Sequence, residues 1–451
     1  MSLGIVILAA GQGTRMHSTL PKVLHPLAGQ PMILYAVEAA RALTDLPPVL
    51  VVGYGGEKVR QVVGEAVTYV EQAQQRGTGH AVLQAQPALE GRTTEVLVVY
   101  ADMPLLKEAT LRRLWERQRA NPGPITMLTL VSDNPRGFGR VVRDERGTVV
   151  QIVEEAVATP EQMAIRELNA GVYCFDAEWL WSHVGLIPLS LPKREYYLTC
   201  LIGMATAEGQ RVETIPVEDA AEVLGINTRA HLAEAEAALR SRINRRWMEA
   251  GVTMMDPATT YIEAYVTIGP DTVIWPNTYL RGQTRVGAGC QIGPNSLIED
   301  STIGDGCRVV ASVVEEAVME EGSDVGPFSH LRPGARLEAG AHVGNFGEVK
   351  NATLGPGAKM GHFSYLGDAG VGAGANIGAG TITCNFDGKQ KHRTEIGEGA
   401  FIGSDTMLVA PVRVGKGART GAGSVVTRDV PDGALAYGVP ARVREGKDRK
   451  D

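Results

Sequence analysis

Two glycines and an arginine follow a short apolar run near the start of the sequence, IVILAAGQGTRM (residues 5–16). A turn of this kind exposes backbone N–H groups, which bind anions such as phosphate. Two common phosphate loops are excluded, because no Lys-Ser/Thr pair follows and the third glycine of G-x-G-x-x-G is absent. The loop therefore indicates a phosphate-bearing ligand without identifying it.

The elements around this loop alternate between short apolar strands and helices. Residues 5–8, 49–52 and 96–99 are predicted to be buried strands, and residues 31–43 and 108–120 are predicted to be helices. Over residues 1–227 this alternation predicts a Rossmann-like α/β domain with a mostly parallel sheet covered on both faces. Ligands of such sheets bind at the carboxyl ends of the strands, where the glycine loop lies.

A long helix separates this domain from a second architecture. Residues 228–250 contain no Gly or Pro and are rich in Ala, Leu, Glu and Arg, which predicts a linker helix that Gly251 ends. Beyond it, aliphatic residues recur every six positions, a period that neither a helix nor a simple strand produces. The positions are Ile262, Ile268, Ile274, Leu280, Val286, Ile292 and Ile298, then Ile303 and Val309, then Val325, Leu331, Leu337, Val343 and Val349, then Leu354, Met360 and Leu366, then Val371 and Ile377, and finally Ile396, Ile402, Leu408, Val414, Thr420 and Val426.

This period predicts a left-handed parallel β-helix of hexapeptide repeats over residues 251–437. Between Ile377 and Ile396 the period is interrupted by the polar stretch 378–395. We interpret it as a loop that projects from one face, where function tends to lie. Residues 438–451 are predicted to be a basic C-terminal tail.

Composition limits the class of protein. The length of 451 residues predicts two or three domains, and the net charge of −7 disfavours nucleic acid or an anionic membrane as the main partner. The five cysteines include no C-x-x-C pair, which favours a reducing cytoplasm over a disulfide framework or a zinc site. The first apolar run is too short to span a membrane. We expect a soluble cytoplasmic protein.

The stretch LAAGQGTRM followed by PKVL (residues 21–24) resembles the signature of sugar-1-phosphate nucleotidyltransferases. Together with GHFSYLGDA and NIGAGTITCNFDG in the hexapeptide region, essentially the whole chain resembles the bifunctional N-acetylglucosamine-1-phosphate uridyltransferase/glucosamine-1-phosphate acetyltransferases. The resemblance implies acetyl transfer from acetyl-CoA to glucosamine-1-phosphate. Uridyl transfer from UTP to N-acetylglucosamine-1-phosphate would follow, releasing pyrophosphate and forming a nucleotide sugar for cell-wall synthesis.

The resemblance also implies the residues of a uridyltransferase site. UTP phosphates would be held by the backbone of the loop and by two cations, whereas Gln72, Gly77 and Thr78 would read the uracil. The loop residues are Leu8, Ala9, Ala10, Gly11 and Gly13, and the catalytic cations are Arg15 and Lys22. The sugar side would include Tyr100, Ala101, Asp102, Gly139, Glu154, Asn169 and Asn227. Asp102 and Asn227 would hold Mg²⁺, which prefers oxygen ligands.

Two departures from the family pattern occur in this domain. Ala101 stands where the family has Gly, which puts close backbone approach to the sugar in question. Glu155, Ala156 and Val157 replace a stretch where the family usually has Lys-Asp, so no lysine assistance is assumed there.

For acetyl transfer the resemblance implies His362 as general base, because a histidine can deprotonate the amine near neutral pH. Glu348 would orient its ring. Absence of a Ser or Cys nucleophile motif favours direct transfer. The acceptor sugar phosphate would contact Arg332, Lys350, Tyr365, Asn376, Asn385 and Phe386. Coenzyme A would lie along Ala379, Ser404 and Ala422, with the Ala379 N–H as a possible oxyanion donor.

This half also departs from the family at two places. Phe386 stands where Tyr is common, and the segment 437–440 replaces one that often has an Arg for coenzyme A. The cations of the tail could supply that charge, namely Arg442, Arg444, Lys447, Arg449 and Lys450.

The flat sides of a three-faced solenoid predict a homotrimer with acetyltransferase sites between subunits. Two alternatives remain at this point. In one, the chain is a nucleotidyltransferase whose β-helix only oligomerises or regulates it. In the other, the solenoid is a catalytically idle scaffold. His362 and the loop 378–395 distinguish the bifunctional enzyme from both alternatives, because neither alternative needs these residues.

Overall fold

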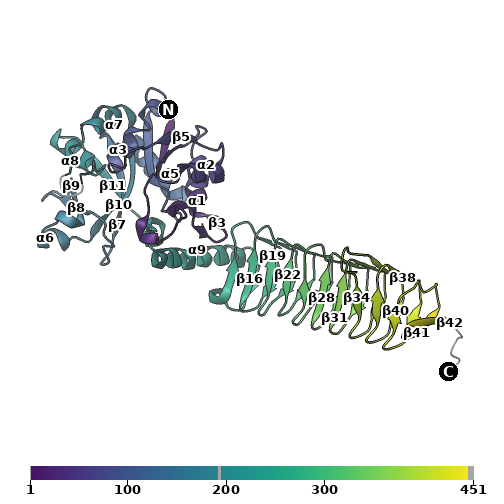
Figure 1. Ribbon diagram of the computed structural model, residues 1–451. Helices are drawn as coiled ribbons and strands as arrows, with labels where there is room; N and C mark the ends of the chain where they lie inside the picture. Colours follow the sequence, from purple (N-terminus) through teal and green to yellow (C-terminus); the bar gives the residue numbers. More distant parts are fainter. Residues whose placement is uncertain (1, 191–193, 445–451) are drawn as a thin grey trace. The chain divides into compact units, whose positions relative to one another are not determined.

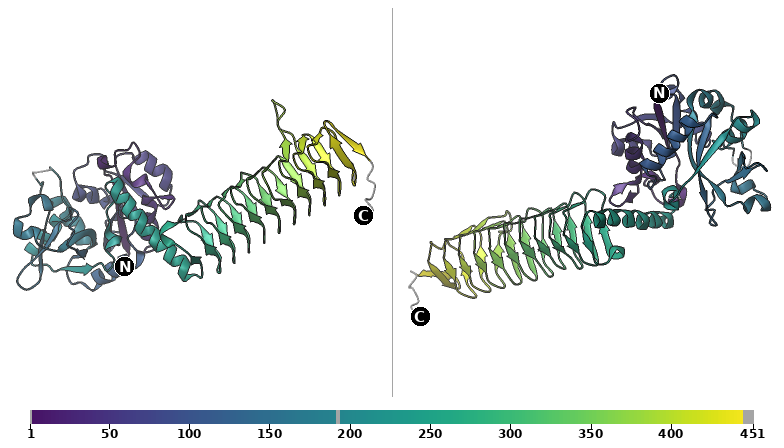
Figure 2. Two further views of the ribbon diagram at one scale, coloured as in Figure 1. Left: turned by 90° about the horizontal axis from the view of Figure 1, so that it is seen from below. Right: turned by 180° about the vertical axis from the view of Figure 1, so that it is seen from behind.

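The computed structural model describes residues 2–190 and 194–444 of the chain. It divides into two compact units, Met1–Leu239 and Arg240–Asp451. The division falls inside helix α9 (Arg229–Glu249), which occupies almost the whole of the predicted linker helix. Each unit is described separately below (Figures 1 and 2).

The first unit contains a mixed sheet with the strand order β11-β7-β10-β6-β1-β4-β5, and β8 and β9 extend it beside β10. β10 runs antiparallel to both of its neighbours, and the other pairs along this order are parallel. The bounds are β1 (Leu3–Ala9), β4 (Val49–Val52), β5 (Thr68–Glu71), β6 (Glu95–Tyr100), β7 (Ile125–Val131), β8 (Arg140–Arg143), β9 (Val149–Val153), β10 (Glu167–Asp176) and β11 (Val212–Pro216), with the small pair β2 (Pro26–Leu27) and β3 (Gln30–Pro31) apart.

Helices cover both faces of this sheet (Figure 1). On one face Val6 and Val98 pack in a buried cluster with Ala81, Leu180 and Leu201, which come from three helices. The helices are α1 (Met32–Arg41), α2 (Gly56–Val63), α3 (Thr78–Leu83), α4 (Gln86–Leu89), α5 (Glu108–Ala120), α6 (Pro160–Met163), α7 (Ala177–His183) and α8 (Cys200–Ala207). Short 3₁₀ turns complete the unit, among them η1 (Thr14–Met16), η2 (Lys22–Leu24) and η3 (Glu155–Val157). The predicted α/β class is confirmed.

The second unit is a parallel β-helix built from three sheets, and the predicted hexapeptide fold is confirmed (Figure 2). The first sheet contains β12 (Thr253–Met254), β15 (Val273–Ile274), β18 (Gln291–Ile292), β21 (Arg308–Val309), β24 (Asp324–Val325), β27 (His342–Val343), β30 (Lys359–Met360), β33 (Asn376–Ile377), β36 (Phe401–Ile402), β39 (Arg419–Thr420), β41 (Leu435–Gly438) and β42 (Ala441–Arg444).

The second sheet contains β13 (Thr260–Ile262), β16 (Thr278–Arg281), β19 (Leu297–Glu299), β22 (Val313–Glu315), β25 (His330–Leu331), β28 (Gly347–Lys350), β31 (Ser364–Gly367), β34 (Ile382–Cys384), β37 (Met407–Val409) and β40 (Val425–Val426). The third contains β14 (Thr267–Ile268), β17 (Arg285–Val286), β20 (Thr302–Ile303), β23 (Val318–Met319), β26 (Arg336–Leu337), β29 (Thr353–Leu354), β32 (Ala369–Val371), β35 (Thr394–Ile396) and β38 (Val412–Val414).

Every residue of the predicted six-residue period is buried in the solenoid. The period missed Val314 and Met319, which are also buried, because the coil between Val309 and its partner Val325 is shorter than its neighbours. Burying one such aliphatic side chain contributes about 1.5–3 kcal/mol, and each coil buries three. The repeated inward residue is therefore the main source of stability of the solenoid.

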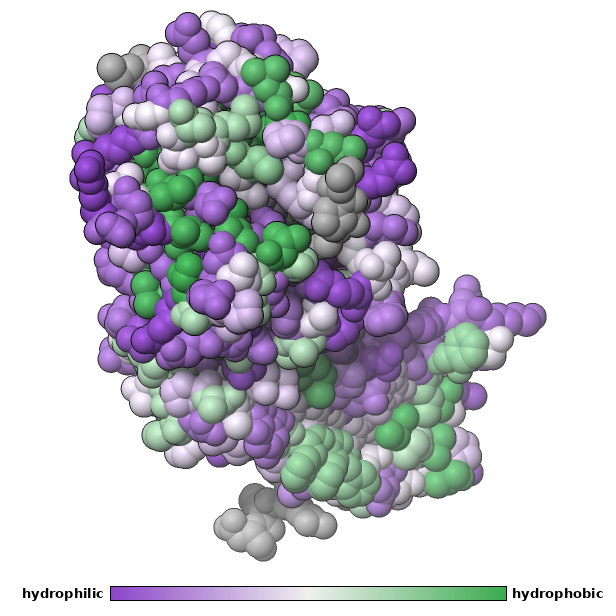
Figure 3. Space-filling model, turned by 90° about the vertical axis from the view of Figure 1, so that its left-hand side faces the viewer, coloured by the Kyte–Doolittle hydropathy of each residue, from purple (hydrophilic) through white to green (hydrophobic). Residues whose placement is uncertain are grey.

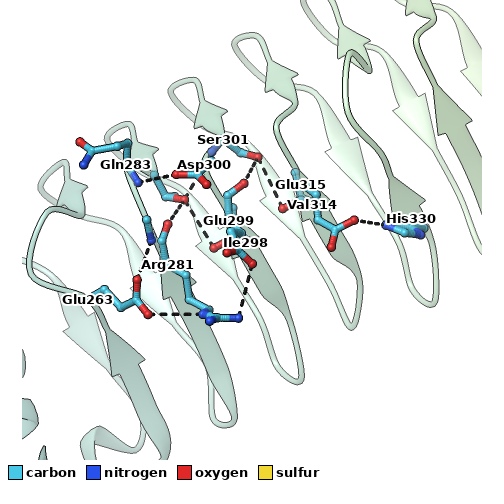
Figure 4. A network of polar contacts seen from close by, with 12 residues as sticks. Glu263, Arg281, Gln283, Ile298, Glu299, Asp300, Ser301, Val314, Glu315 and His330 are labelled. Carbon is cyan, nitrogen blue, oxygen red and sulfur yellow. Dashed lines mark hydrogen bonds and ion pairs between the residues drawn. The ribbon is translucent and has the colours of Figure 1, made fainter. Parts of the chain in front are cut away.

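Polar side chains tie successive coils together along the outside of the solenoid (Figure 4). The Asp300 carboxylate accepts a hydrogen bond from the Gln283 N–H (2.8 Å), which satisfies a turn amide of the preceding coil. Arg281 lies between Glu263 (3.3 Å) and Glu299 (3.4 Å) of the coils on either side. Such exposed pairs contribute little each, about 0–1 kcal/mol, so they set register more than stability.

Both ends of the solenoid are capped. The Asn244 side chain of α9 is buried and donates to the carbonyls of Pro257 (2.8 Å) and Thr260 (2.9 Å) at the first coil. At the other end β41 and β42 form an antiparallel hairpin. This differs from the predicted tail, because Arg442 and Arg444 belong to β42, which pairs with β41. The predicted tail cations Lys447, Arg449 and Lys450 lie outside the described residues.

The interruption of the period is a projecting hairpin (yellow-green in Figure 2, left). Phe386 and Lys391 pair across it, and the His392 ring contacts the Asp387 carboxylate (2.7 Å). Backbone N–H groups of the loop, first that of Gln390, and the His392 ring lower the pKa of Asp387. The loop is therefore held by its own hydrogen bonds.

We find no helix among residues 2–190 and 194–444 with the length and apolar character that crossing a bilayer requires. On the side of the molecule that Figure 3 displays, hydrophobic residues form patches among hydrophilic ones.

Candidate active sites

A cavity of about 330 Å³ lies at the carboxyl ends of β1 and β6 in the first unit. The glycine loop, the turn before α3 and the end of β6 form its walls, as the alternating pattern predicts. Its lining residues are Leu8, Ala9, Ala10, Gly11, Lys22, Val23, Gln72, Gln75, Gly77, Thr78, Ala81, Tyr100, Asp102 and Glu195. Ten of the predicted site residues therefore line one cavity, together with Gln75 and Glu195, which the sequence did not single out.

The Lys22 ammonium lies between the two predicted metal ligands. It forms an ion pair with Asp102 and donates to the Asn227 side-chain oxygen (3.1 Å). The Lys22 and Asp102 side chains are only 11% and 17% exposed, so water screens this pair weakly. The Ile226 N–H donates to the Asp102 carbonyl (2.9 Å) and holds the two segments together. One cation thus reaches both oxygens at once.

This arrangement fits the metal that the resemblance implies. One carboxylate oxygen and one amide oxygen are ligands that Mg²⁺ accepts, with water and phosphate completing its shell. Within the described residues there is no group of three or more His, Cys, Asp or Glu side chains placed to hold a metal. The donor set is that of a weakly held oxygen-bound ion rather than a closed metal cage.

Two glycines allow the walls of the cavity to approach closely. Gly13 has φ +65°, and a Cβ there would lie 2.5 Å from the Lys22 Cβ. Gly77 has φ +97°, and its Cβ would meet the Tyr196 carbonyl at 2.7 Å. A larger residue at either position would clash with the neighbouring segment. Its backbone would also be strained, because residues other than glycine rarely adopt these φ values.

At the turn before α3, Gln72 is buried and its amide donates to the Gly77 carbonyl (3.0 Å) and contacts a ring nitrogen of His80 (3.0 Å). Gln75 donates to the Ala10 carbonyl (2.7 Å), which links the glycine loop to the turn before α3. No residue pattern in the sequence distinguished Gln75 from the neighbouring glutamines.

A second, larger cavity of about 830 Å³ lies beside β9 and η3 of the first unit. Glu154 lines it and accepts a hydrogen bond from the Thr199 hydroxyl (2.9 Å). Its full lining is Gly137, Gln151, Ile152, Val153, Glu154, Glu155, Ala156, Val157, Gln162, Met163, Ser190, Tyr197, Thr199 and Cys200. Burial, and then the charge of Glu195, raises the pKa of Tyr197 to about 12, so its hydroxyl stays protonated at neutral pH.

Other predicted residues of this domain have structural partners. The buried Asn169 amide donates to the Tyr173 hydroxyl (2.7 Å), and its oxygen accepts from the Gly171 N–H (3.0 Å). The Gly139 carbonyl accepts from the Asn169 N–H (2.8 Å). Burial raises the pKa of Tyr100 well above its ordinary value, and the Asp102 charge adds to the shift. Tyr100 is therefore a neutral wall of the first cavity.

Arg15 and Ala101 are among the predicted residues that lie outside the walls of both cavities. Arg15, in η1, is exposed and does not line the first cavity, because the turn directs it to the surface. Ala101 is fully buried and its N–H donates to the Leu8 carbonyl (3.0 Å), so its methyl group does not line the cavity either.

In the second unit, four predicted residues lie beside one another on the second sheet. Glu348 of β28 aligns with Tyr365 of β31, and Lys350 lies on the same strand as Glu348. Arg332 follows β25, and its guanidinium donates to the Glu348 carboxylate (2.7 Å). This hydrogen bond is the main reason that the pKa of Arg332 is raised.

A basic cluster lies next to this row. Lys391 of the projecting loop approaches Lys350 and, by its hydrogen bond and charge, lowers the pKa of Lys350. Asp368 accepts from the amides of Asn351 (2.6 Å) and Asn385 (2.5 Å). Burial opposes ionisation of Asp368, but these hydrogen bonds and the lysine charges lower its pKa overall. Sequence reasoning missed Lys391, because only the folded loop brings it to Lys350.

The three predicted coenzyme A residues stack along one edge of the solenoid. The Asp405 N–H donates to the Ala379 carbonyl (2.6 Å), and the Gly423 N–H donates to the Ser404 carbonyl (2.8 Å). The same edge continues through the Gly380 N–H, which donates to the Phe363 carbonyl (2.7 Å), and so reaches His362. Ala422 precedes Gly423 on this edge.

Part of the predicted acetyltransferase site does not meet within one chain. In the part of the chain that the structure describes, His362 is exposed and makes no hydrogen bond to Glu348. The expected pairing is absent because Glu348 lies on a sheet face, whereas His362 lies at the edge and Arg332 already binds the carboxylate. Asn376 lies on β33 of the first sheet, and Phe386 is exposed on the loop.

Comparisons with known proteins agree with this division. A MobA-like NTP transferase domain model matches residues 5–252, and a bacterial transferase hexapeptide model matches residues 265–300 and 393–428. Proteins named "Bifunctional protein GlmU" align over nearly the full length. That of Heliobacterium modesticaldum is 48% identical over 96% of this chain and 94% of its own. The chain belongs to the GlmU family.

Two other GlmU relatives agree. The protein of Pelobacter propionicus is 47% identical over 99% of this chain and 98% of its own. That of Stutzerimonas stutzeri is 51% identical over 97% of this chain and 96% of its own. Membership therefore covers both units, and the nucleotidyltransferase signature and the hexapeptide repeats belong to one transferase.

Proposed function

We propose that this chain makes UDP-N-acetylglucosamine in two steps. The second unit transfers the acetyl group of acetyl-CoA to glucosamine-1-phosphate. The first unit then transfers UMP from UTP to N-acetylglucosamine-1-phosphate and releases pyrophosphate. The observation that carries the proposal is the single cavity at the ends of β1 and β6, in which the glycine loop, Lys22 and Asp102 converge.

For uridyl transfer, the backbone of Ala10 and Gly11 faces the triphosphate, and Lys22 neutralises its charge. The sugar phosphate oxygen attacks the α-phosphorus, and the bond to the leaving pyrophosphate breaks as negative charge grows on it. Asp102 and Asn227 would hold Mg²⁺, which would stabilise that charge. Gln72 and the turn at Gly77 hold the base, and Glu154 holds the sugar hydroxyls.

For acetyl transfer, His362 removes a proton from the amine of glucosamine-1-phosphate. The amine nitrogen attacks the thioester carbon, and the carbon–sulfur bond breaks to release the coenzyme A thiol. Arg332 and Lys350, with Lys391 beside them, bind the sugar phosphate. Ala379, Ser404 and Ala422 form the edge along which coenzyme A lies.

We propose a homotrimer in which neighbouring chains complete each acetyltransferase site. Support comes from the second sheet, whose outward side chains form an apolar stripe on both sides of the polar row at Arg332 and Glu348. The stripe consists of Tyr261, Tyr279, Leu297, Val313, Ile382, Met407 and Val425.

We also place the protein in the cytoplasm, where UTP and acetyl-CoA are available. The five cysteines are all unpaired thiols, which is typical of a reducing compartment.

A direct test mixes the purified protein with glucosamine-1-phosphate, acetyl-CoA, UTP and Mg²⁺ and identifies the products. Formation of UDP-N-acetylglucosamine supports the proposal if acetylation requires acetyl-CoA and the transfer of UMP requires UTP. UDP-sugar formed only from supplied N-acetylglucosamine-1-phosphate would instead favour a nucleotidyltransferase with an oligomerising solenoid.

The shared site has its own test, which mixes two inactive chains. His362→Ala and Asn385→Ala proteins, unfolded, mixed and refolded together, should regain part of the acetylation, because one site can receive both intact residues. A monomer in sedimentation with full acetyltransferase activity would contradict the shared site.

A further inference from the structure

A fully buried arginine lies beneath the larger cavity of the first unit. The Arg140 side chain, at the start of β8, is 0% exposed. Its guanidinium donates to the Phe138 carbonyl, to Glu155 Oε2 (3.1 Å) and to the Met163 sulfur (3.4 Å). It therefore joins β8 to η3 and α6, the two short helices that follow β9.

Arg140 is poorly explained as a stabilising residue. Its Nε is buried without a hydrogen-bond partner among the described residues, and its carboxylate partner, Glu155, is 38% exposed. A buried charge is costly unless it is fully paired and hydrogen-bonded, and apolar replacements of such pairs are often tolerated. Because the Arg140 guanidinium is buried with one N–H unpaired among the described residues, packing alone does not account for it.

The contacts of Arg140 show which segment it holds. Glu155 is the first residue of η3, and Glu154, its N-cap, points its carboxylate to the Thr199 hydroxyl (2.9 Å). Glu154, Glu155 and Met163 all line the larger cavity. The guanidinium therefore contacts two residues of the cavity wall, Glu155 and Met163. Glu155 directly follows Glu154 in the chain.

We propose that Arg140 is a positioning residue for the acceptor sugar. By holding Glu155, it fixes the start of η3 and so sets the position of the Glu154 carboxylate at the sugar hydroxyls. This inference rests on the proposed uridyl transfer.

Steady-state kinetics of the full-length protein test the proposal, with N-acetylglucosamine-1-phosphate and UTP varied separately. Arg140→Met should raise the KM for the sugar phosphate about tenfold, the effect of losing one charged hydrogen bond. The KM for UTP and the rate of acetyl transfer should stay unchanged. Arg143→Met is the matched control, because Arg143 lies on the same strand and pairs with a carboxylate, Glu167 (2.6 Å). Glu155, the partner of Arg140, lines the larger cavity, whereas Glu167 does not.

A double variant separates positioning from stability. Arg140→Met combined with Glu155→Gln removes both charges, so the thermal unfolding midpoint should recover toward that of the unchanged protein. The KM for the sugar phosphate should stay raised, because the segment is still not held. Recovery of that KM in the double variant, or parallel changes in both KM values, would overturn the proposal.

Glu155→Gln alone keeps the test valid if Arg140→Met does not fold, since this position is partly exposed. It should also raise the KM for the sugar phosphate, and an unchanged KM would contradict the inference. If the unchanged protein forms no UDP-sugar from UTP and N-acetylglucosamine-1-phosphate, the proposed function itself fails and the inference fails with it.

Discussion

Replacing Asp102 by Asn removes one negative charge while keeping the size of the side chain. In the structure this carboxylate pairs with Lys22 beside the Asn227 oxygen, and both partners of the pair are largely buried. A hydrogen bond to a charged group contributes about 1.5–3 kcal/mol. A free energy of 1.36 kcal/mol corresponds to a factor of ten in an equilibrium or rate constant. Loss of this contact alone would therefore change the uridyl transfer rate about 10- to 150-fold.

We expect the uridyl transfer rate of Asp102→Asn to fall about 10²-fold or more, because the same charge would also hold Mg²⁺ against the phosphates. Pyrophosphate release, measured at saturating UTP over a range of Mg²⁺ concentrations, gives this rate. Acetyl transfer, followed by the coenzyme A thiol released, should be unchanged, because its residues lie in the other unit.

The matched control is Asp219→Asn, which also removes a carboxylate paired with a lysine. Asp219 contacts Lys107 at 3.1 Å, but both side chains are more than 40% exposed and neither lines the cavity. This variant should keep its uridyl transfer, because exposed pairs contribute only about 0–1 kcal/mol. Full uridyl transfer by Asp102→Asn at saturating Mg²⁺, with the control equally active, would refute the metal and charge role of Asp102.

Four further outcomes are expected. His362→Ala should lower the acetyl transfer rate about 10²-fold, as loss of a general base does, and the loss should shrink at higher pH, where more amine is unprotonated; an unchanged rate of thiol release at neutral pH would contradict this. Lys391→Met should raise the KM for glucosamine-1-phosphate without changing uridyl transfer, because it removes a cation beside Lys350; the same KM in both proteins would exclude Lys391 from the site. Leu331→Ala should lower the free energy of unfolding of the solenoid by about 2–5 kcal/mol, since Leu331 is fully buried; denaturant unfolding measures the loss, and a change under 1 kcal/mol, well below that range, would count against tight packing there. Burial, and then the charge of Arg229, lowers the pKa of His25, so folding favours the neutral ring. Stability should therefore fall as the pH drops below about 6.5. The thermal unfolding midpoint of His25→Gln should lose that part of the pH dependence, and a pH profile identical to that of the unchanged protein would refute this.

The sequence predicted the fold well because strong periodicities determine it. The apolar runs that became β4 and β6 are continuous and buried on both sides, and the six-residue period marks the inward side chains of the solenoid. The coil containing Val314 escaped the pattern because its repeats are shorter there. The fate of residues 441–444 could not be predicted, since a basic end and a closing strand have the same composition.

The candidate sites were predictable as regions but not as pairs of atoms. Placing Asp102 at the end of a strand follows from the alternation, whereas its pairing with Lys22 depends on two loops that meet only in the fold. Likewise, Glu348 pairs with Arg332, 16 positions earlier, because successive coils stack residues of similar register. Sequence spacing within one motif, such as that around His362, contains no information about the neighbouring coil.

The stacked coils also determine how this protein can vary in length. Each coil pairs with the coil before it and the coil after it, in parallel and in register. A whole coil inserted or deleted between Tyr279 and Leu297 would leave the row of Arg332, Glu348 and Tyr365 with the same immediate neighbours. Duplication or loss of single coils can therefore lengthen or shorten the solenoid in steps of about 4.8 Å, while the chemistry of the acetyltransferase row is inherited intact.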